Sequence, residues 1–83
     1  MIENYMPLNR LQIGKKARVK RLLTVGGIRR RLQDIGLIEG TTVVCLHISP
    51  PGDPIAYWIR GAVIALRSNE AAQILVEGCD TCA

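Results

Sequence analysis

The chain has 83 residues, 48% of them hydrophobic, and a formal net charge of +4 at pH 7. This length predicts a single domain over residues 1–83, with its core at about 7–77 and a polar tail at 78–83, and the hydrophobic content excludes a disordered chain. Two Tyr, one Trp and no Phe are too few for a base-stacking or proline-binding platform.

The first predicted element is a strand over residues 16–23. Ala17 and Val19 alternate with lysines and arginines, which gives one apolar face and one cationic face. The alternation is lost at residues 21–23, which predicts a bulge or the end of the strand. Residues 24–27 contain two glycines and are expected to form a flexible connection.

A short helix is predicted over residues 28–36. Ile28, Leu32 and Ile35 recur at helical spacing, so we expect them to form a stripe that faces the core. Gly36 is well placed to end the helix in the left-handed conformation that glycine tolerates.

The segment after the helix alternates between core residues and turns. Leu37 and Ile38 are expected to return to the core, and residues 39–40 to form a turn. Residues 41–48 are uncharged and rich in β-branched side chains, which predicts a strand with two largely apolar faces in a closed or sandwiched sheet. Three prolines and a glycine make residues 49–54 a loop.

The last elements are short. Residues 55–67 predict two strands with a tight connection at Gly61. Ser68 is expected to cap one helical turn over Asn69–Gln73, and residues 74–76 to form a closing strand. Five short strands favour a small, mainly β barrel, because closure removes the sheet edges; a split α+β sheet is the competing architecture.

Three segments in this order are distinctive together: Arg30–Gly40 (RRLQDIGLIEG), Pro51–Pro54 (PGDP), and Gly61–Arg67 (GAVIALR) with Glu70-Ala71 and Ile74–Val76 after it. The set resembles the FeoA family, the small cytosolic component of bacterial ferrous iron uptake. The resemblance implies an SH3-like β-barrel of five to six strands with one or two short helices. It also implies a non-enzymatic accessory protein whose partner is FeoB, a membrane permease with a cytosolic GTP-binding domain.

A similar domain forms the C-terminal part of iron-dependent repressors of the DtxR type. A nucleic-acid-binding or repressor-derived module is therefore the alternative function. No helix-turn-helix pattern occurs in the 83 residues, and no groove-reading motif accompanies the sequence pI of about 9.3, so the transport role is preferred and nucleic acid is not the expected partner.

Two segments are candidate contacts with the permease. Residues 1–33 contain nine Lys or Arg and one acidic residue, whereas residues 34–83 contain two Arg and six acidic residues. Arg29, Arg30 and Arg31 are expected to dock on an acidic partner surface, because Arg makes bidentate pairs and is enriched at interface hot spots. The alternative is a solvated helix face that keeps the domain soluble. The second candidate contact is the loop formed by Pro51, Gly52, Asp53 and Pro54.

The cysteines suggest a metal site. Cys79 and Cys82 supply two soft ligands, whereas a tetrahedral zinc site needs four. Cys45 and His47, expected on one strand face, complete the set only if the tail folds back onto them. Incidental thiols in an exposed tail and a redox pair are the alternatives. We expect no resident cofactor, and zinc or iron ligation here is the basis of a third hypothesis, a metal-sensing module.

No catalytic set is recognisable in the sequence. There is a single His, and Gly26-Gly27 lacks the rest of a phosphate-binding loop, so we expect neither an enzyme nor a small-molecule substrate. The first residues lack the basic and apolar regions of a signal peptide, and no apolar run approaches the roughly 20 residues of a membrane span. We expect a cytoplasmic protein without membrane insertion, compatible with a peripheral position at the inner face of the membrane and with homo-oligomerisation.

Overall fold

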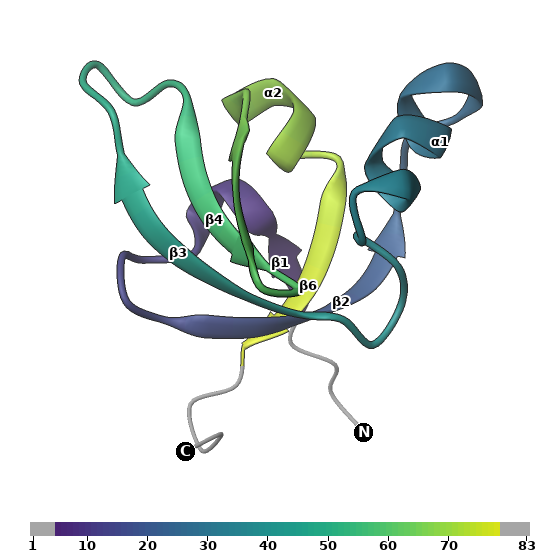
Figure 1. Cartoon of the computed structure of the whole chain (residues 1–83), viewed down its shortest axis with the longest axis horizontal. Coiled ribbons are helices and arrows are strands. Elements are labelled where there is room, and N and C mark those ends of the chain that lie inside the picture. Colours follow the sequence, from purple (N-terminus) through teal and green to yellow (C-terminus); the bar gives the residue numbers. More distant parts are fainter. Residues whose placement is uncertain (1–4, 79–83) are drawn as a thin grey trace.

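Six antiparallel strands, two short α-helices and one 3-10 turn make up residues 5–78, the part of the chain that the computed structural model describes (Figure 1). The strands are β1 (Tyr5–Pro7), β2 (Lys16–Leu22), β3 (Thr42–Ile48), β4 (Ile55–Ile59), β5 (Ala62–Leu66) and β6 (Ile74–Gly78). The helices are α1 (Gly26–Asp34) and α2 (Ser68–Ala71), and the 3-10 turn covers Leu8–Arg10.

The strands form one curled sheet in the order β1-β6-β2-β3-β4-β5. The predicted mainly β fold is confirmed, and its sixth strand is β1, which is too short to show an alternating pattern. No ladder joins β5 to β1 within residues 5–78, so the closure expected to remove the sheet edges is not made by a continuous ladder. The chain passes from β5 through α2 to β6, which inserts between β1 and β2.

The inner face of the sheet holds an aliphatic core with one aromatic ring. Tyr57 is fully buried, and its hydroxyl donates a hydrogen bond to the backbone oxygen of Leu8 at 3.2 Å. A bond of this kind contributes about 0.5–1.5 kcal/mol and fixes the 3-10 turn to β4. The other fully buried large side chains are Leu8, Leu32, Leu37, Ile59, Ile74, Val19, Val43, Val76 and Cys45.

An irregularity in the register of β2 decides which of its side chains face the core. The ladder of β2 with β6 shifts between Val19 and Arg21, as the loss of alternation predicted. Val19 and Leu22 are buried, and Arg21 between them is exposed. One extra residue thus turns the end of β2 so that a cation faces outward just before the chain enters α1.

Helix α1 begins two residues earlier than predicted and ends as predicted. Gly36 has φ +108°, its N–H donates to the oxygen of Gln33, and the N–H of Leu37 donates to the oxygen of Leu32, both at 3.0 Å. These two bonds and the burial of Leu32 and Leu37 make a Schellman motif. Gly26 is the first residue of the helix, so the expected flexible connection at residues 24–27 is shorter than predicted.

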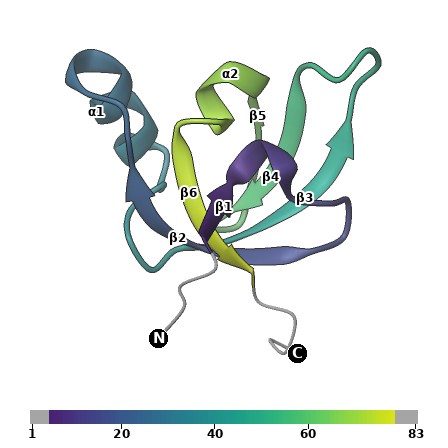
Figure 2. The same ribbon diagram turned by 180° about the vertical axis from the view of Figure 1, so that it is seen from behind.

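Two core assignments in this segment are wrong. Ile28 is 51% exposed and Ile38 is 42% exposed, whereas both were expected to be buried. Only Leu32 of α1 is fully buried, and Ile35 packs at the edge of the core. Figures 1 and 2 show the reason: α1 lies at one side of the molecule, beyond the end of β2, so the sheet covers only part of the helix.

The sequence predicts a turn before β5 and a helical turn after it, and the second differs: α2 covers Ser68–Ala71 instead of Asn69–Gln73. Arg60 and Gly61 both have positive φ, 50° and 87°, as a two-residue type I′ connection requires, and the predicted tight turn is confirmed. Ser68 was expected to cap the helix, but it is the first residue of α2 and does not cap it. Its N–H is instead bound by Asp53 Oδ1 at 2.8 Å, so the cap comes from the loop before β4.

Within residues 5–78, neither helix is long or apolar enough to cross a membrane.

Candidate partner-docking groove

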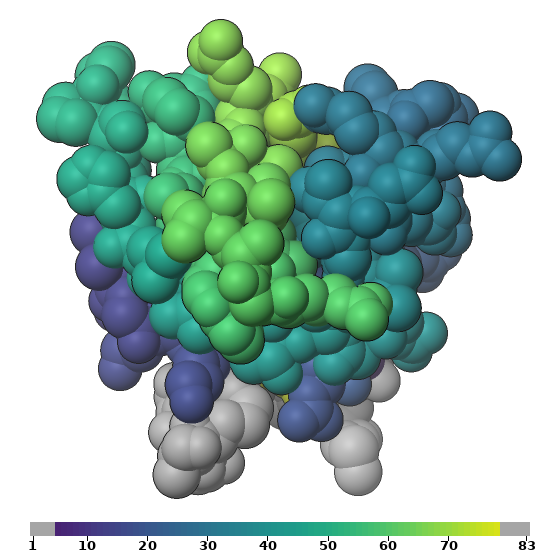
Figure 3. Space-filling model, in the orientation of Figure 1, coloured from purple at the N-terminus to yellow at the C-terminus, as the bar shows by residue number. Residues whose placement is uncertain are grey.

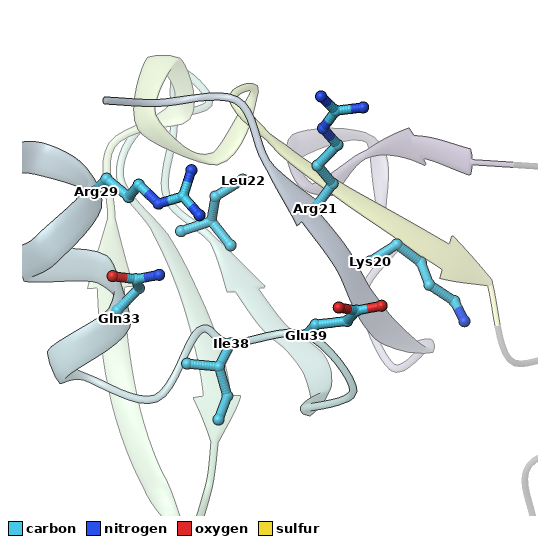
Figure 4. Close-up of a pocket in the computed structure, with 7 residues that line it drawn as sticks. All are labelled: Lys20, Arg21, Leu22, Arg29, Gln33, Ile38 and Glu39. Atoms are coloured by element: carbon cyan, nitrogen blue, oxygen red, sulfur yellow. The ribbon is translucent and has the colours of Figure 1, made fainter. Parts of the chain in front are cut away.

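A groove of about 430 Å³ lies between β2 and α1 (Figure 4). Three elements build it: the bulged end of β2, one face of α1, and the connection from α1 to β3. Its lining residues are Lys20, Arg21, Leu22, Arg29, Gln33, Ile38 and Glu39. Three cations and one carboxylate therefore line this one groove.

Each wall of the groove follows from the local sequence. Arg29 and Gln33 are one helical turn apart and therefore lie on the same face of α1. On the opposite wall, the shift in register before Arg21 leaves Leu22 pointing inward and Arg21 outward. Figure 4 shows Arg29 reaching from the helix toward Leu22, while the guanidinium of Arg21 rises from the strand side.

The cations of the groove are not equally available. Lys20 forms an ion pair with Glu77 of β6, with 3.3 Å between Nζ and Oε1. Within residues 5–78, Arg21 and Arg29 form no ion pair within 4.0 Å. Both guanidinium groups therefore keep their hydrogen-bond donors free for an external carboxylate or phosphate.

Aliphatic side chains surround these cations. Ile38 lines the groove, and Ile28 is next to Arg29 in α1. Leu23 and Val25, the latter 79% exposed, belong to the three-residue connection from β2 into α1. Of the nine large hydrophobic side chains that are exposed within residues 5–78, four therefore belong to this one 16-residue segment.

The three arginines proposed as partner contacts have three different environments. Arg29 lines the groove, and Arg30 is exposed outside it. Arg31 forms an ion pair with Glu70 and thereby joins α1 to α2. The run of three arginines is therefore not one uniform cationic face.

The proline loop lies apart from this groove. In Figures 1 and 3 the loop between β3 and β4 and the helix α1 lie on opposite sides of α2. Asp53 is turned toward α2, where it binds the N–H of Ser68 and pairs with Arg67 at 3.8 Å. Pro51 and Pro54 are exposed, and Gly52 is half-buried. The structure does not bring the two candidate contacts together into one surface.

The suggested metal ligands are also not brought together. Cys45 pairs with Tyr57 across the ladder and is fully buried, and burial raises the pKa of its thiol. The register shifts before His47, which pairs with Ala56 and is exposed, so the expectation that Cys45 and His47 share a face is wrong. Cys79 and Cys82 lie outside the described residues, within which no group of three potential ligands occurs.

Sequence reasoning missed most of the groove. It identified Arg29 but not Lys20, Arg21, Gln33 or Glu39 as members of one site. The available signal was the position of a cationic, bulged strand end only three residues before a cationic helix. Because only three residues connect them, the end of β2 and the start of α1 must lie close together.

The single curled antiparallel sheet with two short helices is an SH3-like fold. Within this fold class the chain belongs to the FeoA domain family, whose model matches residues 6–78, and the family functions in ferrous iron transport. The resemblance inferred from the sequence is thereby confirmed.

Three similar proteins extend this assignment. A Porphyromonas gingivalis fusion of Fe(2+) transport protein A with the transporter FeoB is 33% identical over 72 residues, which is 87% of this chain and 8% of the fusion protein. A solution structure of the FeoA protein from Chlorobium tepidum is 37% identical, with TM-score 0.83 over 88% of this chain and 70% of that one. Stenotrophomonas maltophilia FeoA complexed with zinc, described as a prokaryotic SH3 domain protein, is 28% identical, with TM-score 0.77 over 87% and 89% of the two chains.

A manganese-dependent transcriptional repressor and T. acidophilum IdeR share the fold at 20% and 21% sequence identity. This likeness shows the architecture alone and carries no functional assignment to this chain.

Proposed function

We propose that this chain is a non-enzymatic accessory protein of ferrous iron uptake that binds the cytosolic part of a FeoB-like GTPase-permease. The observation that supports this most strongly is the P. gingivalis fusion, in which a similar domain and FeoB are one polypeptide. Fusion keeps two domains at a high effective concentration, which is useful when they work in contact. The protein then acts on the cytosolic side of the membrane without entering it.

The charge distribution supports docking through the α1 side of the molecule. Residues 1–33 carry nine of the eleven basic residues of the chain. They also supply the groove residues from β2 and α1, and only Ile38 and Glu39 come from the later connection to β3. Clustered cations accelerate association with an acidic surface and orient the encounter. The exposed aliphatic side chains beside them supply the apolar area that a stable contact also needs.

The proline loop is a second, separate candidate contact. Pro51 and Pro54 are exposed at the opposite side of α2, and Asp53 ties the loop to α2. The groove side and the proline loop can both contact the permease if its cytosolic domain is large enough to reach both sides of α2. We expect substitution of Pro51 to weaken binding less than substitution of Arg29, because the loop offers no free charge.

Co-purification with the cytosolic region of the permease from the same organism tests the proposed function. We expect the triple variant Arg29→Glu/Arg30→Glu/Arg31→Glu to reduce capture at least tenfold. The matched control Arg10→Glu/Lys15→Glu/Lys16→Glu changes the net charge by the same amount at exposed positions outside the groove and should retain capture. Failure of the wild-type chain to capture the permease region would contradict the proposal.

A further inference from the structure

We infer that the groove between β2 and α1 binds an acidic segment of the partner, with carboxylates on Arg21 and Arg29 and an aliphatic side chain over Leu22 and Ile38. This inference rests on the proposed function and specifies where the partner binds and what chemistry it presents.

Arg21 and Arg29 are both available to an external anion. Arg21 and Arg29 line opposite walls of the same groove, and neither forms an ion pair with another residue of the described chain. Lys20 and Arg31, by contrast, are already paired with Glu77 and Glu70. Arg29 reaches into the groove from α1, and Arg21 rises at its rim on the outer side of β2 (Figure 4), so an acidic segment that crosses this end of β2 can bind both guanidinium groups.

Glu39 makes the groove more suitable for a protein segment than for other polyanions. Glu39 lines the groove together with the arginines, so a continuous row of phosphates meets a negative charge at that position. A polypeptide avoids this conflict, because it can place carboxylates beside the arginines and an amide or a cation beside Glu39. The concave shape also disfavours a flat membrane surface.

The apolar lining supports the same occupant. Ile38 lines the groove and is 42% exposed, whereas Leu22, which also lines it, is already largely buried. Burying the exposed part of Ile38 contributes about 25 cal/mol per Å² of apolar surface, which carboxylates alone cannot use. A segment with acidic and aliphatic residues satisfies both parts of the groove.

Arg31 has a different role, as a positioning residue. Its ion pair with Glu70 connects α1 to α2 and holds the helical wall of the groove from the side opposite to β2. Arg30 is exposed, carries the same charge and does not line the groove. Neighbouring residues of one helix therefore offer matched controls for the groove.

Titration calorimetry with the purified cytosolic region of the permease separates these roles. We expect Arg21→Glu and Arg29→Glu each to weaken binding at least tenfold, and Arg30→Glu to change it less than threefold. All three substitutions are at exposed positions, and equal urea midpoints would show that they leave the fold intact. Wild-type binding that is unaffected by both groove variants would overturn the inference and leave the proposed function standing, whereas absence of wild-type binding would overturn both.

A photo-cross-linking residue at position 33, which lines the groove but takes no part in the proposed ion pairs, tests the chemistry of the occupant. We expect mass spectrometry to locate the cross-link in a permease segment that contains at least two Asp or Glu. Attachment to a segment without acidic residues would overturn the inference. So would Arg29-dependent binding to vesicles of phosphatidylcholine with 30% phosphatidylserine in place of binding to the permease region.

Discussion

The two helices of this small protein are attached in opposite ways. Helix α2 is only four residues long, yet two other segments bind its first turn: Asp53 Oδ1 accepts from the N–H of Ser68 at 2.8 Å, and Asn9 donates to the Ser68 hydroxyl at 3.3 Å. Glu70 of the helix itself accepts from the N–H of Arg67 at 3.3 Å. Helix α1 is nine residues long and has a single fully buried side chain, Leu32.

This difference separates structural from functional surface. Around α2 the polar groups satisfy one another, so little binding capacity remains there. Around α1 the arginines at the groove are unpaired and several aliphatic side chains are exposed. A helix that contributes so little to the core is retained, in this account, because its outer side binds a partner.

The largest effect should come from removing the residue that anchors α1. Leu32→Ala deletes a fully buried side chain and should lower the free energy of unfolding by about 2–5 kcal/mol. Ile28→Ala, one turn earlier and half exposed, should change it by about 0.5 kcal/mol or less. Urea denaturation measures both. Equal losses would mean that α1 is packed along its whole length.

The end of α1 offers a slightly smaller effect. Gly36 has φ +108°, and a Cβ there would lie 2.6 Å from Cδ of Arg60. Gly36→Ala should therefore lower the free energy of unfolding by about 1–3 kcal/mol. Arg60→Ala should reduce that loss in the double variant, because it removes the clash and leaves only the backbone strain. The four unfolding curves of this cycle test whether the contact matters.

Alkaline pH should destabilise the core at the Cys45–Tyr57 pair. Burial raises the pKa of the Cys45 thiol, and burial together with the Cys45 thiolate raises the pKa of the Tyr57 hydroxyl. Above about pH 9 the unfolded chain releases these protons while the folded chain retains them, so stability falls as pH rises. We expect a loss of about 1 kcal/mol between pH 8 and pH 10. Tyr57→Phe should lower stability at pH 8 through its lost hydrogen bond but flatten this decline.

The smallest effect is expected for the link between the two helices. Arg31 is 59% exposed at its side chain, so its ion pair with Glu70 should contribute about 0.2–1 kcal/mol and weaken with salt. A double-mutant cycle of Arg31→Ala and Glu70→Ala measures the coupling. Zero coupling at low salt would show that α1 is held by Leu32 and the Schellman motif alone.

The sequence predicted those parts of the molecule that depend on local patterns. Gly36, the turn at Gly61 and the irregularity near Arg21 each follow from one residue type or one break in alternation. The errors arose where tertiary placement decides. Ile28 fits a helical stripe, but its exposure depends on how far the sheet extends beneath α1.

The groove could be predicted only in part for the same reason. Arg29 was identified from its charge, whereas Glu39 joins it only because the chain returns from α1 to β3 beside the bulged end of β2. Asp53 was expected to be available to a partner, yet it binds α2 fifteen residues away in sequence. Such pairings are set by topology, which composition and periodicity do not encode.

Mapping amide chemical shifts during titration with the permease cytosolic region tests the central claim most directly. The account predicts that the largest changes fall on residues 20–22, 29–33 and 38–39, while the loop at residues 50–54 and Trp58 on the outer side of β4 change little. Changes concentrated in that loop or around Trp58, with the groove unaffected, would contradict it.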